Sequence, residues 1–410
     1  MFLLSPVSRA WAEINLSALK HNLDVAKQTG RRVMCVIKAN AYGHGAVPCG
    51  RFLQDNGADA FAVATIDEAI ELREHGIALP ILVLGYTHHN YAKLLTHYRL
   101  EQTVVDESAA AELSLAAMQA GTKINVHVKV DTGMSRAGIL AQGEESAHEA
   151  AMAVERIMEM EGLNVVGLYT HFAAADMPTE EKFTAWQMNN FNIIIDYLTA
   201  QNKRPAICHT SNSAAIMNHV NTHIDMVREG IMLYGLYPNN EPHGGNENEK
   251  KLMPVMTLKG RVSQVKELPA DATVSYGRTF KAEGAIKVAI ISIGYADGYP
   301  RCLSNRAWVK IGGKVYPQIG RVCMDMIMAD VTNSGGLQSA VKRGDEVILF
   351  GKNGMSVEEV ANIVGTINYE ITCLVTPRAK RVYIGAAPPP DGFFASHGKN
   401  INAGEERILH

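Results

Sequence analysis

The 410-residue sequence has few cysteines, and no two of them have CxxC spacing. Scattered cysteines are typical of reduced thiols in the cytosol and do not indicate a disulfide framework. We therefore expect a cytoplasmic protein. The six positions are Cys35, Cys49, Cys208, Cys302, Cys323 and Cys373.

Long apolar runs and an excess of one charge are also missing. The opening MFLLSPVSRAWAEI has only a short apolar start without a basic segment, and no later uncharged run approaches membrane length. We expect neither export nor membrane anchoring. The formal net charge is −3, from 39 Lys and Arg against 42 Asp and Glu. No overall field would attract nucleic acid or anionic lipid, so we expect neither partner.

What is present is an ordinary globular composition, with 47% apolar and 20% charged residues. A chain of 410 residues exceeds what one hydrophobic core usually accommodates. We therefore expect two domains, one of them a large barrel.

Short apolar, β-branched runs alternate with segments of helical period from residue 13 to about 240. Eight parallel strands close a (β/α)8 barrel, although a doubly wound open sheet predicts the same alternation. Within this region, Thr65 and Glu68 predict a capping box, while Ser17 and Gly30 predict the ends of the first helix. The eight predicted strands are 34–37, 60–64, 81–84, 102–105, 124–130, 165–170, 206–209 and 225–228.

The composition changes after Pro238, where residues 239–251 are polar and glycine-rich and predict a linker. We expect a barrel over 12–245 and a mostly β domain over 246–385, and we expect an N-terminal strand, residues 1–11, to join the β domain. Residues 386–410 predict a flexible tail. The predicted elements of the β domain are strands at 255–265, 286–293, 308–311 and 346–350 and a helix at 356–364.

The segment VIKANAYGHG carries the most specific chemical signal. A buried strand ends at Lys38, and barrel enzymes place catalytic groups at the carboxyl ends of their strands. A partly desolvated lysine loses its proton more readily, and the neutral amine attacks aldehydes such as that of pyridoxal phosphate. The spacing alone also allows a lysine that merely extends to solvent at a strand end.

KANAYGHG resembles the lysine motif of alanine racemases, and the resemblance extends from about residue 9 to 384. It implies a (β/α)8 barrel followed by a mostly β domain, pyridoxal 5′-phosphate as cofactor, and racemisation of L- and D-alanine that supplies D-alanine for peptidoglycan. Further similar blocks are KVDTGMSRAG, GLYTHFAAAD, SNSAA, MVREGIMLYG, VSYGRTF, IGYADGYPR, GRVCMDM and INYEI.

The resemblance implies that the cofactor's phosphate is bound by Ser213 and the backbone of Gly230 and Ile231, assisted by Tyr42 and Tyr369. A phosphate dianion requires donors, and the last strands of a barrel commonly provide them. Taken alone, SNSAA also reads as a helix cap.

Arg228 matches the family's partner of the pyridine nitrogen. A guanidinium stays protonated at ordinary pH, so it disfavours protonation of the ring and weakens its capacity to accept electrons. Rapid proton exchange between two positioned bases suits this arrangement. Without the family, a surface ion pair explains an arginine equally well.

By the same resemblance, Lys38 handles the proton of the D-isomer and Tyr276 that of the L-isomer, with Tyr276 contributed by a second subunit. A homodimer with shared active sites follows. A tyrosine needs neighbours that favour its ionised form, and His171 and Arg228 are the candidates. A tyrosine after a strand otherwise packs more often than it reacts.

The remaining implied residues bind or enclose the substrate. Arg136 matches the arginine that contacts the cofactor's phenolic oxygen and the substrate carboxylate. Lys129 matches a lysine that is often carbamylated and then braces that arginine. Met324 and Asp325 match a pair that closes over the substrate, and Tyr295 matches a tyrosine that narrows its entrance together with Tyr369.

Several alternatives stay open. A serine or broader-specificity racemase uses the same scaffold, because pockets reject an added hydroxyl weakly. A barrel decarboxylase would carry a carboxylate at the position of Arg228, and a cofactor carrier would lack the β domain. At position 40 this sequence has asparagine, whereas aspartate is commoner at the matching position of the family. His88 and His89 have no HExxH or CxxC beside them, so we expect no metal.

Overall fold

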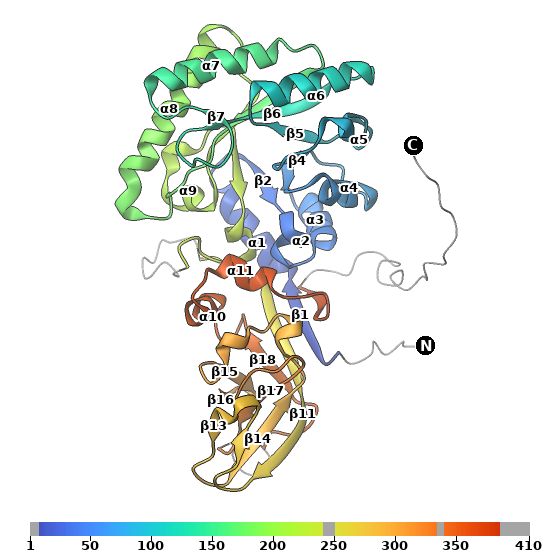
Figure 1. Cartoon of the computed structure of the whole chain (residues 1–410), viewed down its shortest axis with the longest axis vertical. Coiled ribbons are helices and arrows are strands. Elements are labelled where there is room, and N and C mark those ends of the chain that lie inside the picture. Colours follow the sequence, from blue (N-terminus) through green and yellow to red (C-terminus); the bar gives the residue numbers. More distant parts are fainter. Residues whose placement is uncertain (1–7, 241–250, 334–339, 386–410) are drawn as a thin grey trace, which may run out of the picture.

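The computed structural model describes residues 8–240, 251–333 and 340–385. The chain forms an upper and a lower part along its long axis (Figure 1). The predicted linker lies largely outside the described residues, and the predicted tail lies wholly outside them. In the part of the chain described, no helix has the length and apolar character needed to cross a lipid bilayer.

The upper part is a parallel barrel. Its strands follow the order β10-β2-β3-β4-β5-β6-β8-β9, and every paired neighbour runs parallel. Backbone hydrogen bonds from Asp225 to Cys208 (3.1 Å) and from Arg228 to Ser211 (2.9 Å) join the two ends. All eight predicted strands are confirmed, and the closure decides for the barrel over the open sheet. The strands are β2 (Arg32–Val36), β3 (Ala60–Val63), β4 (Ile81–Val83), β5 (Glu101–Val104), β6 (Ile124–Asp131), β8 (Leu163–Tyr169), β9 (Ile207–His209) and β10 (Met226–Glu229).

Helices cover the outside of this barrel, as alternating periodicity requires. The capping box predicted at Thr65 and Glu68 is confirmed. The prediction of Ser17 as a cap is wrong, because the Asn15 side chain accepts the hydrogen bond from Ala18 N at 3.1 Å. Gly30 lies beyond the end of α1. The helices are α1 (Leu16–Lys27), α3 (Ala46–Asp55), α4 (Ile66–Glu74), α5 (Ala92–His97), α6 (Glu107–Gln119), α7 (Glu144–Met158), α8 (Glu181–Ala200) and α9 (Ser213–Asn218).

The lower part is built around one long strand, β11 (Met256–Leu268). It pairs with both β18 and β14, so the strands β11-β14-β17-β16-β15-β18 form a closed ring. A register irregularity between Val262 and Gln264 marks where β11 bends between partners. The other members are β14 (Ile286–Ile291), β15 (Trp308–Ile311), β16 (Lys314–Ile319), β17 (Ile327–Asp330) and β18 (Glu346–Phe350).

The beginning and end of the described chain extend this sheet together. β1 (Ala10–Asn15) pairs antiparallel with β11 and parallel with β19 (Lys380–Ile384). A strand near the N-terminus therefore does join the β domain, but the predicted bounds of 1–11 are corrected to Ala10–Asn15. Most of its residues are buried, and Glu13 and Asn15 are partly exposed. Because burial favours one pairing over a shifted one, the register of this strand is strongly specified.

The β domain also braces the barrel beside Lys38. Helix α11 (Asn368–Cys373) lies so close that a Cβ on Gly43 would fall 2.2 Å from the Thr372 carbonyl oxygen. Arg381 donates to the carbonyl oxygen of Gly43 at 2.8 Å, and the Tyr383 hydroxyl donates to that of His44 at 3.1 Å. The second domain thus fixes the backbone that follows the barrel's first strand.

Glu229 is an acidic residue in the interior of the barrel. Its side chain is fully buried in β10, and neither carboxylate oxygen has a hydrogen-bond partner among the residues described. Burial therefore raises the pKa of Glu229 well above its usual range. The folded protein keeps a proton here that the unfolded chain releases near its ordinary pKa. This contribution to stability is complete below the unfolded pKa and is lost as pH rises through the folded-state pKa.

We expect Glu229→Gln to remove this pH dependence. Between about pH 5 and 9, the free energy of unfolding should fall more steeply in the wild type, by up to about 1.4 kcal/mol per pH unit. Thermal unfolding midpoints measured across that range would show the difference. Glu283→Gln, a change at an exposed position, is the matched control. Parallel curves for the wild type and Glu229→Gln would contradict a buried, protonated carboxyl.

Candidate active site

The lysine predicted from sequence sits on an unusual turn. Strand β2 ends at Val36, and the residues after Lys38 adopt left-handed backbone angles, with φ between 50° and 54° from Ala39 to Tyr42. Each such non-glycine residue costs roughly 1–2 kcal/mol. Backbone strain of this kind persists only where surrounding contacts hold it, and it concentrates at functional sites.

Two side chains hold this turn. Asn40 Oδ1 accepts from Ala46 N at 2.8 Å, at the start of α3, where no cap side chain is otherwise present. Glu68 accepts from Ala39 N at 2.6 Å. The carboxylate of Glu68 therefore serves both its helix cap and the backbone beside Lys38. Together these contacts fix Lys38 at the carboxyl end of its strand.

Positive charge is concentrated around Lys38. Burial and the nearby Arg136 lower the pKa of Lys38, so its amine loses a proton more readily. Burial, Arg136 and Arg228 lower the pKa of Lys129 to about 8. His171 lies among the same cations, and burial together with Arg228 keeps its pKa well below the usual value. His171 is therefore neutral, and the group as a whole favours an anionic ligand.

Arg228 is held in place by a nearly complete set of acceptors. Its buried guanidinium donates from Nη1 to Nδ1 of His209 (2.8 Å) and to the His209 carbonyl oxygen (2.9 Å). Nη2 donates to the carbonyl oxygens of Thr170 (2.7 Å) and Thr210 (2.8 Å) and lies 3.3 Å from Nδ1 of His171. Within the described residues, only Nε has no acceptor. The N–H of Nε is thus free to donate to a ligand.

A second group of donors lies beside the last strand. The Ser213 hydroxyl accepts from Gly230 N at 2.9 Å and from Met232 N at 3.4 Å. A Cβ on Gly230 would lie 3.3 Å from the Tyr42 hydroxyl oxygen and 3.4 Å from Ser213 Oγ. Glycine therefore leaves room between these hydroxyls, next to the buried Ile231. The predicted phosphate-binding residues are brought together around this space.

The sequence SNSAA does contain a helix cap, but the cap is Asn212. Its side chain accepts from Ala215 N at 3.0 Å at the start of α9. Ser213 is the first helical residue, and its hydroxyl is available for the neighbouring strand.

Tyr369 reaches the same region from the second domain. It lies on α11, and its ring centroid is 6.2 Å from that of Tyr42. Burial raises the pKa of both phenols, so both remain protonated hydroxyl groups at neutral pH. The sequence-based grouping of Tyr369 with Tyr42 is consistent with this contact.

Four predicted residues form a separate, exposed group on the β domain. Tyr276 is 73% exposed, Met324 51% and Tyr295 42%. Asp325 is exposed and pairs with Arg378 at 2.5 Å.

Backbone contacts bring these loops together. Ser275 Oγ donates to Arg321 O at 2.7 Å, and Tyr295 N donates to Cys323 O at 3.0 Å. Figure 1 shows β13 (Phe280–Lys281) far down the lower domain from α2 (Lys38–Tyr42). Within one chain, Tyr276 belongs to the β domain and Lys38 to the barrel.

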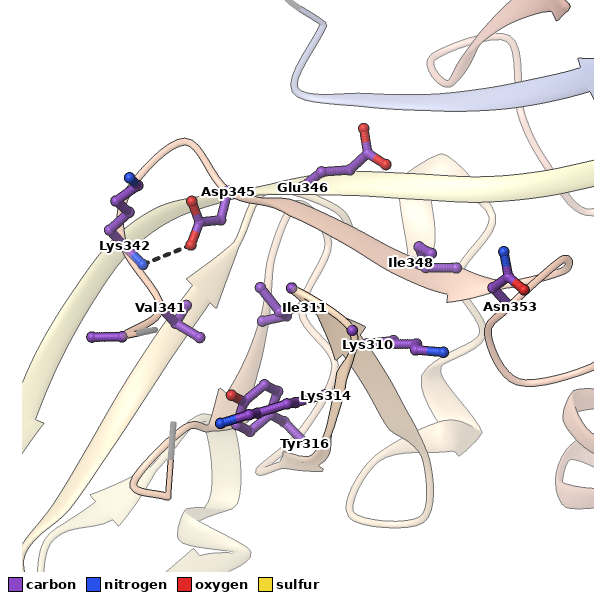
Figure 2. Close-up of a pocket in the computed structure, with 13 residues that line it drawn as sticks. Lys310, Ile311, Lys314, Tyr316, Val341, Lys342, Asp345, Glu346, Ile348 and Asn353 are labelled. Carbon is purple, nitrogen blue, oxygen red and sulfur yellow. Dashed lines mark hydrogen bonds between the residues drawn. The ribbon is translucent and has the colours of Figure 1, made fainter. Parts of the chain in front are cut away.

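Other surfaces are less suited to the predicted chemistry. Figure 2 shows a groove in the β domain lined by Lys310, Lys314 and Lys342, together with Asp345 and Glu346. None of the predicted site residues lines it. No group of three or more His, Cys, Asp or Glu side chains within residues 8–240, 251–333 and 340–385 is arranged to hold a metal ion.

Sequence reasoning missed residues that support the site from within the barrel. His209 accepts a hydrogen bond from Arg228. His127 is hydrogen-bonded both to His209 and to Glu101. A signal was present: His127 and Lys129 are two apart in one strand and share its inward face. Without the barrel's geometry, however, a polar strand residue does not reveal its partner.

The fold and site together define a class: a (β/α)8-barrel enzyme with a lysine after its first barrel strand, cationic surroundings and a C-terminal β domain. Comparison with known proteins is specific. Residues 14–238 match the family "Alanine racemase, N-terminal domain", and residues 255–383 match "Alanine racemase, C-terminal domain". The chain belongs to the alanine racemase family and is an amino-acid racemase.

Individual relatives agree with this assignment. The alanine racemase of Desulforamulus reducens is 43% identical over 378 residues, covering 92% of this chain and 99% of the relative. That of Clostridium perfringens is 44% identical over 386 residues, covering 92% and 96%. The solved alanine racemase of Clostridium difficile 630 is 37% identical, with a TM-score of 0.85 over 93% of this chain and 97% of that chain.

The strained turn yields a direct test at Asn40. We expect Asn40→Ala to lower the free energy of unfolding by about 1–2 kcal/mol, because the acceptor for Ala46 N is lost and alanine tolerates left-handed angles less well. Asn40→Asp keeps both properties and should stay within about 0.5 kcal/mol of the wild type. Chemical denaturation measures each value.

Asn202 offers the matched control, since it also has a positive φ, of 55°, and its side chain makes no hydrogen bond with the described residues. Asn202→Ala therefore measures the backbone cost alone. Equal losses at positions 40 and 202 would mean that the Asn40–Ala46 contact contributes nothing.

Proposed function

We propose that this protein interconverts L- and D-alanine with pyridoxal 5′-phosphate, as a cytoplasmic homodimer that supplies D-alanine for peptidoglycan. The observation that carries the proposal is Lys38, held on a strained turn among buried cations in a chain of the alanine racemase family. We also propose a domain boundary near residue 245, which is supported by family matches that end at 238 and resume at 255.

The residues present fit this cofactor. Ser213, Gly230, Ile231 and Tyr42 surround a space that suits a phosphate, and the free Nε–H of Arg228 suits an unprotonated ring nitrogen. When bound, pyridoxal phosphate would supply an electron-withdrawing ring that acidifies the α-proton of an amino acid joined to its aldehyde. Arginine rather than aspartate at the ring limits side reactions that need a strongly electron-accepting ring.

Lys38 serves as the base for the D-isomer. Its lowered pKa favours the neutral amine, which would hold the cofactor's aldehyde and would accept the α-proton of the D-isomer. Its placement at the end of a barrel strand holds Nζ on one side of the substrate.

Tyr276 of a second copy serves as the base for the L-isomer. This assignment is supported by its exposure and by its location on the β domain, whereas Lys38 lies on the barrel. A phenol needs positive neighbours to lose its proton near neutral pH. His171, neutral and in contact with Arg228, supplies the route through which that guanidinium stabilises the phenolate.

Met324, Asp325 and Tyr295 of the second copy then close the substrate pocket, facing Tyr369. Their common exposed surface on the β domain supports this assignment. The ion pair of Asp325 with Arg378 restrains the closing loop.

Arg136 binds the substrate carboxylate, and carbamylated Lys129 braces it. The proposal for Lys129 is supported by its surroundings: burial and three nearby cations lower its pKa to about 8, so a neutral amine is available to react with carbon dioxide. The carbamate formed would place an anion between Lys129 and Arg136, where two positive charges otherwise repel.

Mixing two inactive variants tests the shared site. Lys38→Ala should lose the visible absorbance of the bound cofactor and its turnover, while Tyr276→Phe should keep the absorbance and lose Cα-proton exchange from L-alanine by at least about a hundredfold. A dimer with one chain of each kind contains one site with both bases. Equal mixing should therefore restore about a quarter of wild-type activity.

Each variant mixed with itself is the control, and differently tagged chains verify that mixed dimers form. Absence of any recovery in verified mixed dimers would refute a contribution of Tyr276 from the second copy. A chiral product panel that includes serine decides between alanine and broader specificity.

Carbamylation of Lys129 has a spectroscopic signature. Protein incubated with ¹³C-bicarbonate should show one protected carbamate resonance that is absent from Lys129→Ala, because the lowered pKa supplies the reactive neutral amine. The resonance should vanish when the pH falls well below 8, since the protonated amine does not react. A spectrum without the resonance at pH about 8 would overturn the assignment.

A further inference from the structure

A chain of buried hydrogen bonds leads from Arg228 through the barrel interior. His209 Nδ1 accepts from Arg228 Nη1 at 2.8 Å, and His209 Nε2 lies 2.8 Å from His127 Nδ1. His127 Nε2 lies 3.0 Å from Glu101 Oε2. Both histidines are fully buried, and the Glu101 side chain is 14% exposed. Glu101 begins β5, so the chain ends toward the opposite rim of the barrel from Lys38.

The donor and acceptor properties of the groups decide in which direction each hydrogen bond of this series is donated. A guanidinium only donates, so His209 Nδ1 must accept and carry no proton. Burial and Arg228 lower the pKa of His209 well below its usual value, so the ring is neutral and its single proton is on Nε2. That proton must be donated to His127 Nδ1. The proton of His127 is then on Nε2 and is donated to the Glu101 carboxylate, which only accepts.

The barrel backbone leaves room for the His127 ring of this hydrogen-bond series. β8 carries one extra residue, Val166, so that His127 is paired with Gly167. A Cβ on Gly167 would lie only 2.1 Å from His127 Nδ1 and 2.4 Å from Cε1. Any other residue at position 167 would therefore displace the imidazole. Glycine in a strand interior often marks such a close approach.

Aromatic packing fixes the second ring. Tyr169 stacks on His209 with ring centroids 4.8 Å apart and planes 8° apart. The Tyr169 hydroxyl is in turn hydrogen-bonded to Thr103 Oγ1 at 3.0 Å. His209 can thus accept from Arg228 only in the observed orientation.

We propose that Glu101 and His127 are positioning residues that hold the ring of His209 in place and thereby the orientation of Arg228. Both Nη atoms of Arg228 are committed to the barrel, and their anchors decide where Nε–H is presented. The inference rests on the proposed role of Arg228 toward the cofactor ring. Loss of the carboxylate at Glu101 removes the acceptor of His127 Nε2–H, so the His127 ring can flip or change tautomer and no longer supports His209.

The first experiment needs no cofactor or activity. Long-range ¹H–¹⁵N correlation spectra of cofactor-free protein with ¹⁵N-labelled histidine distinguish the two neutral tautomers. We expect His127 and His209 both as the Nε2–H form in the wild type. Glu101→Gln, which keeps an acceptor oxygen, should preserve this pattern. Glu101→Ala and Gly167→Ala should each abolish it at His127, the first by removing its partner and the second by displacing its ring.

The second experiment measures turnover in the holoenzyme. Loss of one such hydrogen bond should lower kcat of Glu101→Ala about fivefold, the equivalent of about 1 kcal/mol, with KM for alanine within about twofold. Glu101→Gln should retain most of kcat. The matched control is Glu107→Ala, which removes a carboxylate from an exposed ion pair with Arg156.

The outcomes separate the two proposals. Wild-type histidines in mixed or Nδ1–H forms would overturn the chain itself, whatever the enzyme does. Altered tautomers in Glu101→Ala with unchanged kcat would overturn the positioning role. A wild-type protein without racemase activity would refute the proposed function, while the spectra would still decide whether Glu101 fixes the histidines.

Discussion

The site depends on one constraint: the guanidinium of Arg228 is buried inside the barrel and must have its donors satisfied there. A buried charge without partners would cost several kcal/mol. Its acceptors are Nδ1 of His209 and the carbonyl oxygens of three residues. These residues, Thr170, His209 and Thr210, lie at the carboxyl ends of two adjacent strands. Burial and this guanidinium also keep His171 neutral, and among the described residues Nε of Arg228 is left without an acceptor. The cations around it, Lys38 among them, then favour an anionic ligand.

The β domain contributes in two separate ways. On its own barrel, α11 and β19 press against Gly43 and hold the left-handed turn that carries Lys38. Elsewhere on its surface it exposes Tyr276 and Met324, the residues that the proposed function assigns to a second copy. The same domain thus stabilises the turn that carries Lys38 and exposes a separate group of candidate site residues. Strain beside the lysine is maintained because packing from both domains opposes its release.

Much of the fold could be predicted from the sequence. The eight barrel strands were predicted because each is a short buried run between helical segments, and the capping box at Thr65 follows from local hydrogen-bonding geometry. Predictions were wrong where two neighbouring residues could make the same local hydrogen bond. Ser17 and Asn15 are both able to cap α1, and only the position of the helix start in the fold selects Asn15. The strands β16 and β17 were missed because their pairing partners, distant in sequence, determine them.

The sequence by itself determined the eight alternating strands, the mostly β second domain and the family, because hydrophobic periodicity and a dense local motif can be recognised along the chain. Tertiary structure alone decided that the barrel closes, that Ser213 faces Gly230, and that His127 fits only against a glycine on the next strand. The reason is physical. Contacts between strands depend on register, and one inserted residue such as Val166 changes which side chains meet.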